Sequence, residues 1–108
     1  MLRICYIYIV HMNDLQFDWD KSKAVLNKKK HVVSFQEAVT VFYDDDALEF
    51  HDPDYSDSEE RFFMVGLSFR TRVLLVSHCI RESGSLIRVI SARKATKQVA
   101  LKYWEEKP

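Results

Sequence analysis

Near the C-terminus, an alternating strand pattern runs directly into a basic sequence that can open a helix. Arg88, Arg93 and Lys94 lie at this corner, and the hydroxyl-bearing Ser91 lies between them. Guanidinium groups present planar, paired donors that suit phosphate oxygens. The corner therefore predicts a site for a phosphodiester backbone, with RNA as the substrate that we expect first. The competing interpretation is that these side chains form only the solvated edge of a small sheet.

RNA cleavage without a metal needs a base for the 2′-hydroxyl proton, cations that stabilise charge at phosphorus, and an acid for the leaving 5′-oxygen. His78 and Glu60 are the candidates for proton transfer, and histidine is favoured because it exchanges protons near neutral pH. The plainer interpretations are a hydrogen-bonded strand-end histidine for His78 and an ion-pair partner that positions a cation for Glu60. The residues expected to bind RNA are Arg61, Arg81, Ser91, Lys94 and Lys97.

Length and composition indicate one compact domain over residues 1–108. The chain is 47% hydrophobic and has two glycines and two prolines, unlike a disordered chain. Its net charge of zero hides an acidic middle and a basic C-terminal half, and the basic half indicates a nucleic-acid face. Cys5 and Cys79 lack the spacing of a zinc site and indicate a reduced, cytoplasmic protein. The apolar run at residues 4–10 is too short to cross a membrane.

An acidic stretch at residues 52–57 offers oxygen ligands but lacks the turn glycine and the closing glutamate of a calcium loop. We therefore expect no metal and no other cofactor, and we interpret this stretch as a solvated turn.

Two helices are expected in the N-terminal half. Asp18 or Asp20 can cap the first, at residues 21–30, which has lysines on one face. A capping box over residues 34–37 predicts the second, because its serine and glutamate side chains can satisfy each other's exposed backbone amides. The apolar faces are formed by Trp19, Val25 and Leu26 in the first helix and by Phe35, Ala38, Val39 and Phe42 in the second.

Strands follow these helices. Residues 47–51 predict a short strand, and the connections between the later strands are too short for helical crossovers, so we expect an antiparallel meander. A last helix is expected to begin at Thr96 or Ser91 and to end near Glu105, with Tyr103 on its apolar side. The predicted class is α+β: two helices, about four strands and a C-terminal helix. The three longer strands are expected at residues 61–68, 72–78 and 86–92.

Four segments follow one another with nearly unbroken spacing over residues 17–104: FDWDKSKAVLNKKKHVVSFQEAVTVF, DPDYSDSEERFFMVG, LLVSH and IRVISARKAT. In this order they resemble the BrnT family of toxins. The resemblance implies an endoribonuclease of a type II toxin-antitoxin system, with a fold similar to the RelE-like mRNA interferases. It also implies neutralisation by a BrnA-type antitoxin that carries a ribbon-helix-helix DNA-binding region. Because Arg88 and Arg93 belong to the family-like motif, we expect them to stabilise the transition-state charge.

The chain departs from the family pattern in two places. Family members commonly have a glutamate in the last helix where this chain has Val99, so the alternative function is a weakened or inactive module that binds nucleic acid or antitoxin. Family members also begin shortly before the Phe-x-Trp-Asp motif. We therefore expect Met12 to be the start, whereas the alternative is that residues 4–10 add an edge strand.

Overall fold

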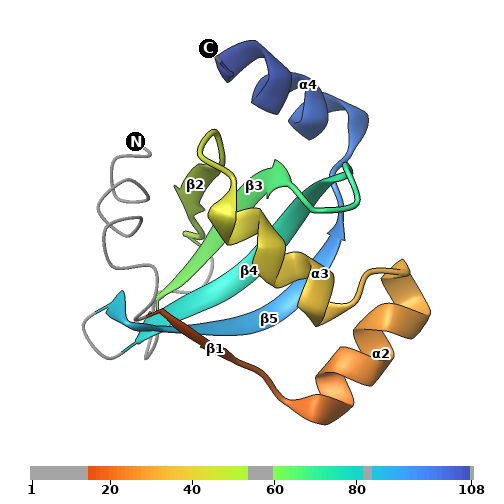
Figure 1. Ribbon diagram of the computed structural model, residues 1–108, viewed down its shortest axis with the longest axis vertical. Helices are drawn as coiled ribbons and strands as arrows, with labels where there is room; N and C mark the ends of the chain where they lie inside the picture. Colours follow the sequence, from red (N-terminus) through yellow and green to blue (C-terminus); the bar gives the residue numbers. More distant parts are fainter. Residues whose placement is uncertain (1–14, 54–59, 82–83, 108) are drawn as a thin grey trace.

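The computed structural model describes residues 15–53, 60–81 and 84–107. The possible edge strand at residues 4–10 and most of the expected turn at residues 52–57 lie outside this part of the chain. No helix in the described part is long and apolar enough to span a bilayer. Along the chain the elements are β1 (Gln16–Asp18), α2 (Lys21–His31), α3 (Phe35–Thr40), the 3₁₀ helix η2 (Val41–Tyr43), β2 (Leu48–His51), β3 (Arg61–Leu67), β4 (Val73–Arg81), β5 (Leu86–Lys94) and α4 (Lys97–Glu106) (Figure 1).

The strands form one sheet in the order β1-β5-β4-β3-β2. The antiparallel pairing of β2, β3, β4 and β5 confirms the predicted meander. The expected count of four strands was incomplete, because β1 adds a fifth strand that runs parallel to β5. Gln16 begins this pairing by donating from its backbone amide to the Ser85 carbonyl at 2.9 Å. A strand of three residues is too short to show an alternating pattern.

One face of the sheet carries the core. In Figure 1, α3 crosses this face in front of β4 and β5. Side chains alternate between the two faces of a strand, so Leu74 and Val76 point into the core while Leu75 and Ser77 point away. Phe35, at the start of α3, is fully buried against them. The core cluster consists of Val33, Phe35, Ala38, Val41, Ala47, Met64, Leu74, Val76, Val89 and Ala92.

The first helix has the predicted start but not the predicted apolar face. Asp20 caps α2 by accepting hydrogen bonds from the backbone amides of Ser22 at 2.9 Å and Lys23 at 3.2 Å. The side chains of Val25 and Leu26, expected to be buried, are 67% and 64% exposed. Amphipathic spacing gave the wrong result because α2 lies at the edge of the sheet rather than across its core face (Figure 1).

The amide side chain of Asn27 hydrogen-bonds α2 to β5. Asn27 is the buried residue of this helix. Its Nδ2 donates to the carbonyls of Ala92 at 2.8 Å and Val33 at 3.0 Å, and its Oδ1 accepts from the Ala92 amide at 3.1 Å. Asn27 thus pairs with both backbone groups of one β5 residue, as a neighbouring strand would.

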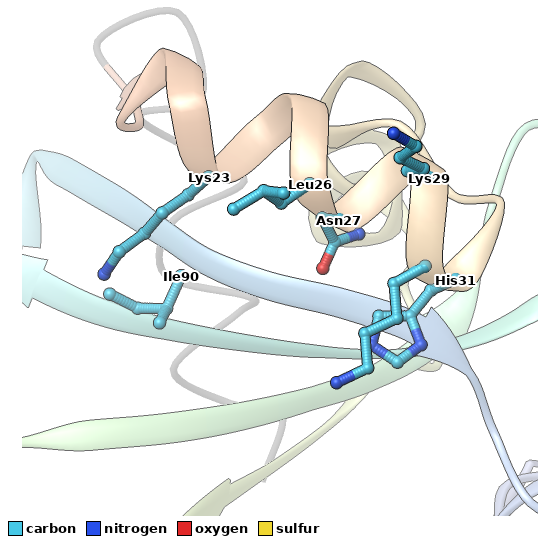
Figure 2. Close-up of a pocket in the computed structure, with 7 residues that line it drawn as sticks. Lys23, Leu26, Asn27, Lys29, His31 and Ile90 are labelled. Carbon is cyan, nitrogen blue, oxygen red and sulfur yellow. The ribbon is translucent and has the colours of Figure 1, made fainter.

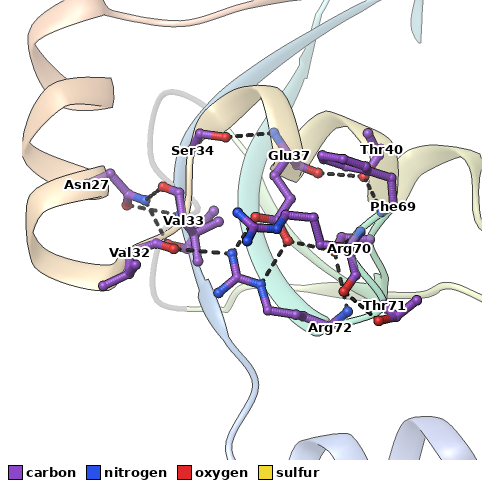
Figure 3. A network of polar contacts seen from close by, with 12 residues as sticks. Asn27, Val32, Val33, Ser34, Glu37, Thr40, Phe69, Arg70, Thr71 and Arg72 are labelled. Atoms are coloured by element: carbon purple, nitrogen blue, oxygen red, sulfur yellow. Dashed lines mark hydrogen bonds and ion pairs between the residues drawn. The ribbon is translucent and has the colours of Figure 1, made fainter.

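The second helix starts at the predicted cap, but only half of the capping box forms. The Ser34 hydroxyl accepts a hydrogen bond from the Glu37 amide at 3.0 Å. The Glu37 carboxylate, instead of returning to the Ser34 amide, forms an ion pair with Arg72 and accepts from the Ser68 hydroxyl at 2.6 Å. Arg72 also donates to the Val32 carbonyl at 3.2 Å, just after α2. Figure 3 shows this network joining α3, the β3-β4 turn and the end of α2.

The last helix begins at Thr96, one of the two predicted caps, whose hydroxyl accepts from the Val99 amide at 3.3 Å. Tyr103 anchors α4 by donating from its hydroxyl to Asp44 Oδ2 at 2.6 Å. Burial, followed by this hydrogen bond to a carboxylate, raises the pKa of the Tyr103 phenol above its usual range. The phenol therefore remains a hydrogen-bond donor throughout the physiological pH range.

Replacing Glu37 tests the buried ion pair. Burial of the Glu37 carboxylate alone would raise its pKa, but the hydrogen bonds from Arg72 and Ser68 outweigh this effect and lower the pKa below its usual value. Glu37→Gln should therefore reduce the free energy of unfolding by about 2–4 kcal/mol at pH 7, measured by urea denaturation. The difference from wild type should shrink as the pH falls from about 4.3, the ordinary glutamate pKa, through the lower pKa of the folded protein.

Glu106 provides the matched control. It pairs with Lys102 on the surface of α4, where both side chains are more than half exposed. Glu106→Gln should change stability by less than about 1 kcal/mol. A difference between wild type and Glu37→Gln that stays constant from pH 7 to pH 3 would contradict an ionised, stabilising Glu37.

Candidate nucleic-acid interface

A polar hollow opens on the sheet face opposite the core. Its volume is about 440 Å³, and we call it the basic hollow. It contains two guanidinium groups and one imidazole, with one carboxylate among its lining residues. The lining residues are His31, Asp52, Arg61, Phe63, Leu75, Ser77, Ser91, Ala92 and Arg93.

The strand register explains why these side chains meet. Ser77 lies between Phe63 and Ser91 in one row across β3, β4 and β5. The neighbouring row brings Leu75 opposite Arg93. Positions two apart on a strand share a face, so these two rows point out of the same side of the sheet. The three residues of the sequence-predicted RNA site that gather here are Arg61, Ser91 and Arg93.

Two of the groups in the basic hollow differ in how firmly they are held. Asp52 is 6% exposed, and its backbone amide donates to the Arg61 carbonyl at 2.8 Å. Arg93 is exposed, and within the described residues its guanidinium has no hydrogen-bond or ion-pair partner. The Arg93 guanidinium is therefore available to an anion that enters the hollow.

His31 enters the basic hollow from α2 and was not among the predicted site residues. It is the last residue of that helix, which ends because Val32 adopts the left-handed conformation at φ 58°. The bonds from Asn27 to Ala92 bring this helix end against β5 between Ser91 and Arg93. Asn27 and Ala92 are 65 residues apart, so no local sequence signal places His31 beside the arginines.

His78 lies on the opposite face of the sheet from the basic hollow. It is fully buried, and its ring packs edge-on against Phe42 at a centroid distance of 4.8 Å. Its Nε2 lies 3.2 Å from Glu49 Oε2, and its Nδ1 lies 3.3 Å from the Val76 carbonyl oxygen. This position favours the plainer interpretation, in which His78 is a hydrogen-bonded histidine within the sheet.

The remaining predicted residues lie around the hollow or away from it. Glu60 is exposed next to Arg61, and its carboxylate lies 3.5 Å from His51 Nε2. Arg88 forms an ion pair with Asp18 at 3.2 Å across the β1-β5 edge. Neither side chain lines the basic hollow. Among the predicted RNA-binding residues outside the hollow, Arg81 ends β4, Lys94 ends β5 and Lys97 begins α4.

The donor set of the basic hollow suits an anion better than a cation. Its charged groups are mainly cationic, whereas hard metal ions need several oxygen ligands. Over residues 15–53, 60–81 and 84–107, no cluster of three or more His, Cys, Asp or Glu side chains could hold a metal. The hollow can therefore stabilise a phosphate through arginine, with His31 present to exchange protons.

Comparison with known proteins identifies the family of this chain. The model for "Ribonuclease toxin, BrnT, of type II toxin-antitoxin system" matches residues 19–98. The fold is similar to the crystal structure of the Brucella abortus ribonuclease toxin BrnT, with a TM-score of 0.59 and 20% identity over 77% of this chain and 99% of that chain. The search of curated proteins gave no match. Because the family model covers most of its length, the chain belongs to the BrnT family of ribonuclease toxins of type II toxin-antitoxin systems.

Proposed function

We propose that this toxin is an endoribonuclease that cleaves RNA without a metal ion, in the basic hollow, and thereby inhibits translation and growth. The observation that carries the proposal is the grouping of Arg61, Arg93 and His31 around Ser77 and Ser91 on one sheet face. Fixed cations beside a proton-exchanging imidazole are the parts that such a cleavage needs. The RelE-like fold and an mRNA substrate remain expectations from the resemblance.

The reaction is an attack of the RNA 2′-oxygen on the neighbouring phosphorus. A base removes the 2′-hydroxyl proton, the new P–O bond forms, and the bond to the 5′-oxygen breaks as that oxygen takes up a proton. The products are a 2′,3′-cyclic phosphate and a 5′-hydroxyl. Arg61 and Arg93 stabilise the extra negative charge on the phosphoryl oxygens, and Ser91 and Ser77 donate hydrogen bonds that orient them.

We assign proton transfer to His31, because it is the histidine that lines the hollow. Glu60 keeps a supporting role, since it directly precedes Arg61, which lines the hollow. Arg88 acts through its ion pair with Asp18, which holds the start of β5 in place. Lys94 is exposed at the end of β5, but it pairs with Leu74 and so points to the sheet face opposite Arg93; it would reach only a phosphate that lies beyond the end of the strand.

The deciding experiment measures cleavage of a labelled single-stranded RNA by the purified protein in EDTA. Arg93→Ala should lower the rate about 10²–10³-fold, because it removes a donor to the transition-state charge. His31→Ala should lower the rate by a comparable factor through loss of proton transfer. Both residues are at least partly exposed, so both variants should keep the wild-type unfolding midpoint.

Two comparisons make this result specific. Lys102→Ala removes an exposed cation on α4 that does not line the hollow, and this variant should cleave within about twofold of wild type. His78→Gln should lower the unfolding midpoint, because the His78 ring is fully buried, and its activity should follow the folded fraction. Equal activity of wild type and His31→Ala would remove His31 from the mechanism, and no cleavage by folded wild type would overturn the proposal.

The alternative function, a weakened or inactive binding module, depends on Val99. This residue is the third of α4, where its amide is capped by Thr96, and it does not line the basic hollow. A glutamate at this position of a helix completes a capping box. Val99→Glu should therefore raise the free energy of unfolding by about 0.5–1 kcal/mol and leave RNA cleavage unchanged. A large gain in cleavage would instead favour the weakened enzyme.

The family implies an antitoxin partner, and we propose a BrnA-like ribbon-helix-helix protein that docks on α4. This helix exposes Leu101 and Trp104 to 57% and 49%, and both line an apolar hollow with Ala100. Exposed apolar patches of this kind mark protein interfaces. Phe35 and Tyr103, by contrast, are buried in the fold and are not available to a partner.

Replacing the exposed tryptophan tests this docking surface. Trp104→Ser should weaken inhibition by added antitoxin about tenfold or more while leaving cleavage without antitoxin intact, because a buried interface tryptophan contributes strongly to binding. Phe69→Ser is the control, since Phe69 is 69% exposed on the β3-β4 turn. Equal inhibition of both variants would exclude the α4 surface.

A further inference from the structure

A second hollow lies between α2 and β5, and we call it the α2-β5 groove. Its volume is about 410 Å³. Figure 2 shows Lys23 and Leu26 extending from α2 toward Ile90 of β5, with His31 at the other end. The lining residues are Lys23, Leu26, Asn27, Lys29, Lys30, His31 and Ile90.

This groove adjoins the basic hollow. His31 lines both. On β5, Ile90 of the groove is followed directly by Ser91 of the hollow. The two depressions therefore meet at one helix end and along one stretch of strand, close enough for one extended chain to occupy both.

The positive charge of α2 is explained better by binding of a polyanion than by stabilisation of the helix itself. The helix sequence KSKAVLNKKKH contains no acidic residue. Lysines in its last turn favour its own dipole, but lysines in the first turn oppose it. Lys21 and Lys23 lie in that first turn, so helix stability does not account for them, whereas attraction to phosphates does.

The apolar part of the groove results from a bulge. Val89 pairs with His78 and Ser91 pairs with Ser77, so Ile90 has no partner on β4. Such a bulge redirects a side chain, and here Ile90 faces Leu26, which is 64% exposed. An apolar floor of two aliphatic side chains with lysines around it can pack against a nucleobase whose flanking phosphates lie at the rim.

We propose that the α2-β5 groove is a second nucleotide subsite, which holds a single RNA strand as it leaves the basic hollow. The inference rests on the proposed ribonuclease function and extends it. Leu26 and Ile90 contact a base, while Lys23 and Lys30 contact the phosphates on either side. Because of this subsite, the toxin should bind an RNA strand that fills both the basic hollow and the α2-β5 groove more tightly than a short segment that fills only the basic hollow.

The test uses fluorescence anisotropy with a fluorescein-labelled, 2′-O-methyl single-stranded RNA of ten nucleotides, which cannot be cleaved because its 2′-oxygens are blocked. The double variant Lys23→Gln/Lys30→Gln should bind this strand about tenfold more weakly at low salt. The slope of log affinity against log salt should fall by about 1.4, since each lost phosphate contact on a single strand contributes about 0.7. The control is Lys102→Gln/Lys107→Gln on α4, which should change neither quantity.

A second pair of variants separates the apolar contact from the ionic one. Leu26→Ser should weaken binding about threefold or more without changing the salt slope, because the lost contact carries no charge. Val25→Ser is the matched control, since Val25 is the preceding residue, is 67% exposed and does not line the groove. The two double lysine variants, Leu26→Ser and Val25→Ser should all show the same unfolding midpoint.

The outcomes distinguish this subsite from the proposed activity. If wild type fails to cleave RNA but binding falls only in the groove variants, the proposed function fails and the subsite stands. If the groove variants bind the ten-nucleotide strand as their controls do, the subsite is overturned, even when Arg93→Ala abolishes cleavage. If instead these variants lose only inhibition by the antitoxin, the groove belongs to a protein partner and the inference is also overturned.

Discussion

The amide side chain of Asn27 replaces a missing strand neighbour at the edge of β5, and the position of α2 depends on it. β1 pairs with β5 only as far as Arg88. Beyond that point the amide and carbonyl of Ala92 would be buried without partners, at a cost of about 1–3 kcal/mol each. Asparagine can satisfy both groups, because it carries a donor and an acceptor on one short side chain. The same contact brings His31 to the basic hollow and closes one wall of the α2-β5 groove.

The bulge at Ile90 determines which side chains of β5 face the core and which face the basic hollow. Without it, Val89 and Ala92 would point to opposite faces, because side chains alternate along a strand. The extra residue shifts the phase by one position, so both of these residues are buried while Ser91 and Arg93 open onto the other face. Ile90 itself is directed toward α2. One irregularity in the strand thus allows a single segment to contribute to the core, the basic hollow and the groove.

Local patterns predicted the elements well, but contacts between distant residues lay beyond them. The caps at Asp20, Ser34 and Thr96 and the four meander strands follow from short-range signals. The Glu37 carboxylate, however, bonds to Arg72, 35 residues away, and this bond outweighs the local capping box. Charge clustering identified Arg93, whereas His31 reaches it only through the contact of Asn27 with Ala92. The position of His78 could have been predicted, because strand alternation places it on the face opposite Ser77.

Cations in this fold fall into two groups, and the difference decides which of them can meet a phosphate. Arg72 has a structural role, since its guanidinium binds Glu37 and the Val32 carbonyl. An incoming phosphate would have to compete with these partners. Arg93 has no such partner among the described residues, so an RNA phosphate would be its first ion-pair partner rather than a competitor. The lysines of α2 belong to this second group. Asn27 is the buried residue of α2 and Ala24 packs against the core, so the lysines of this helix are left exposed as a basic face.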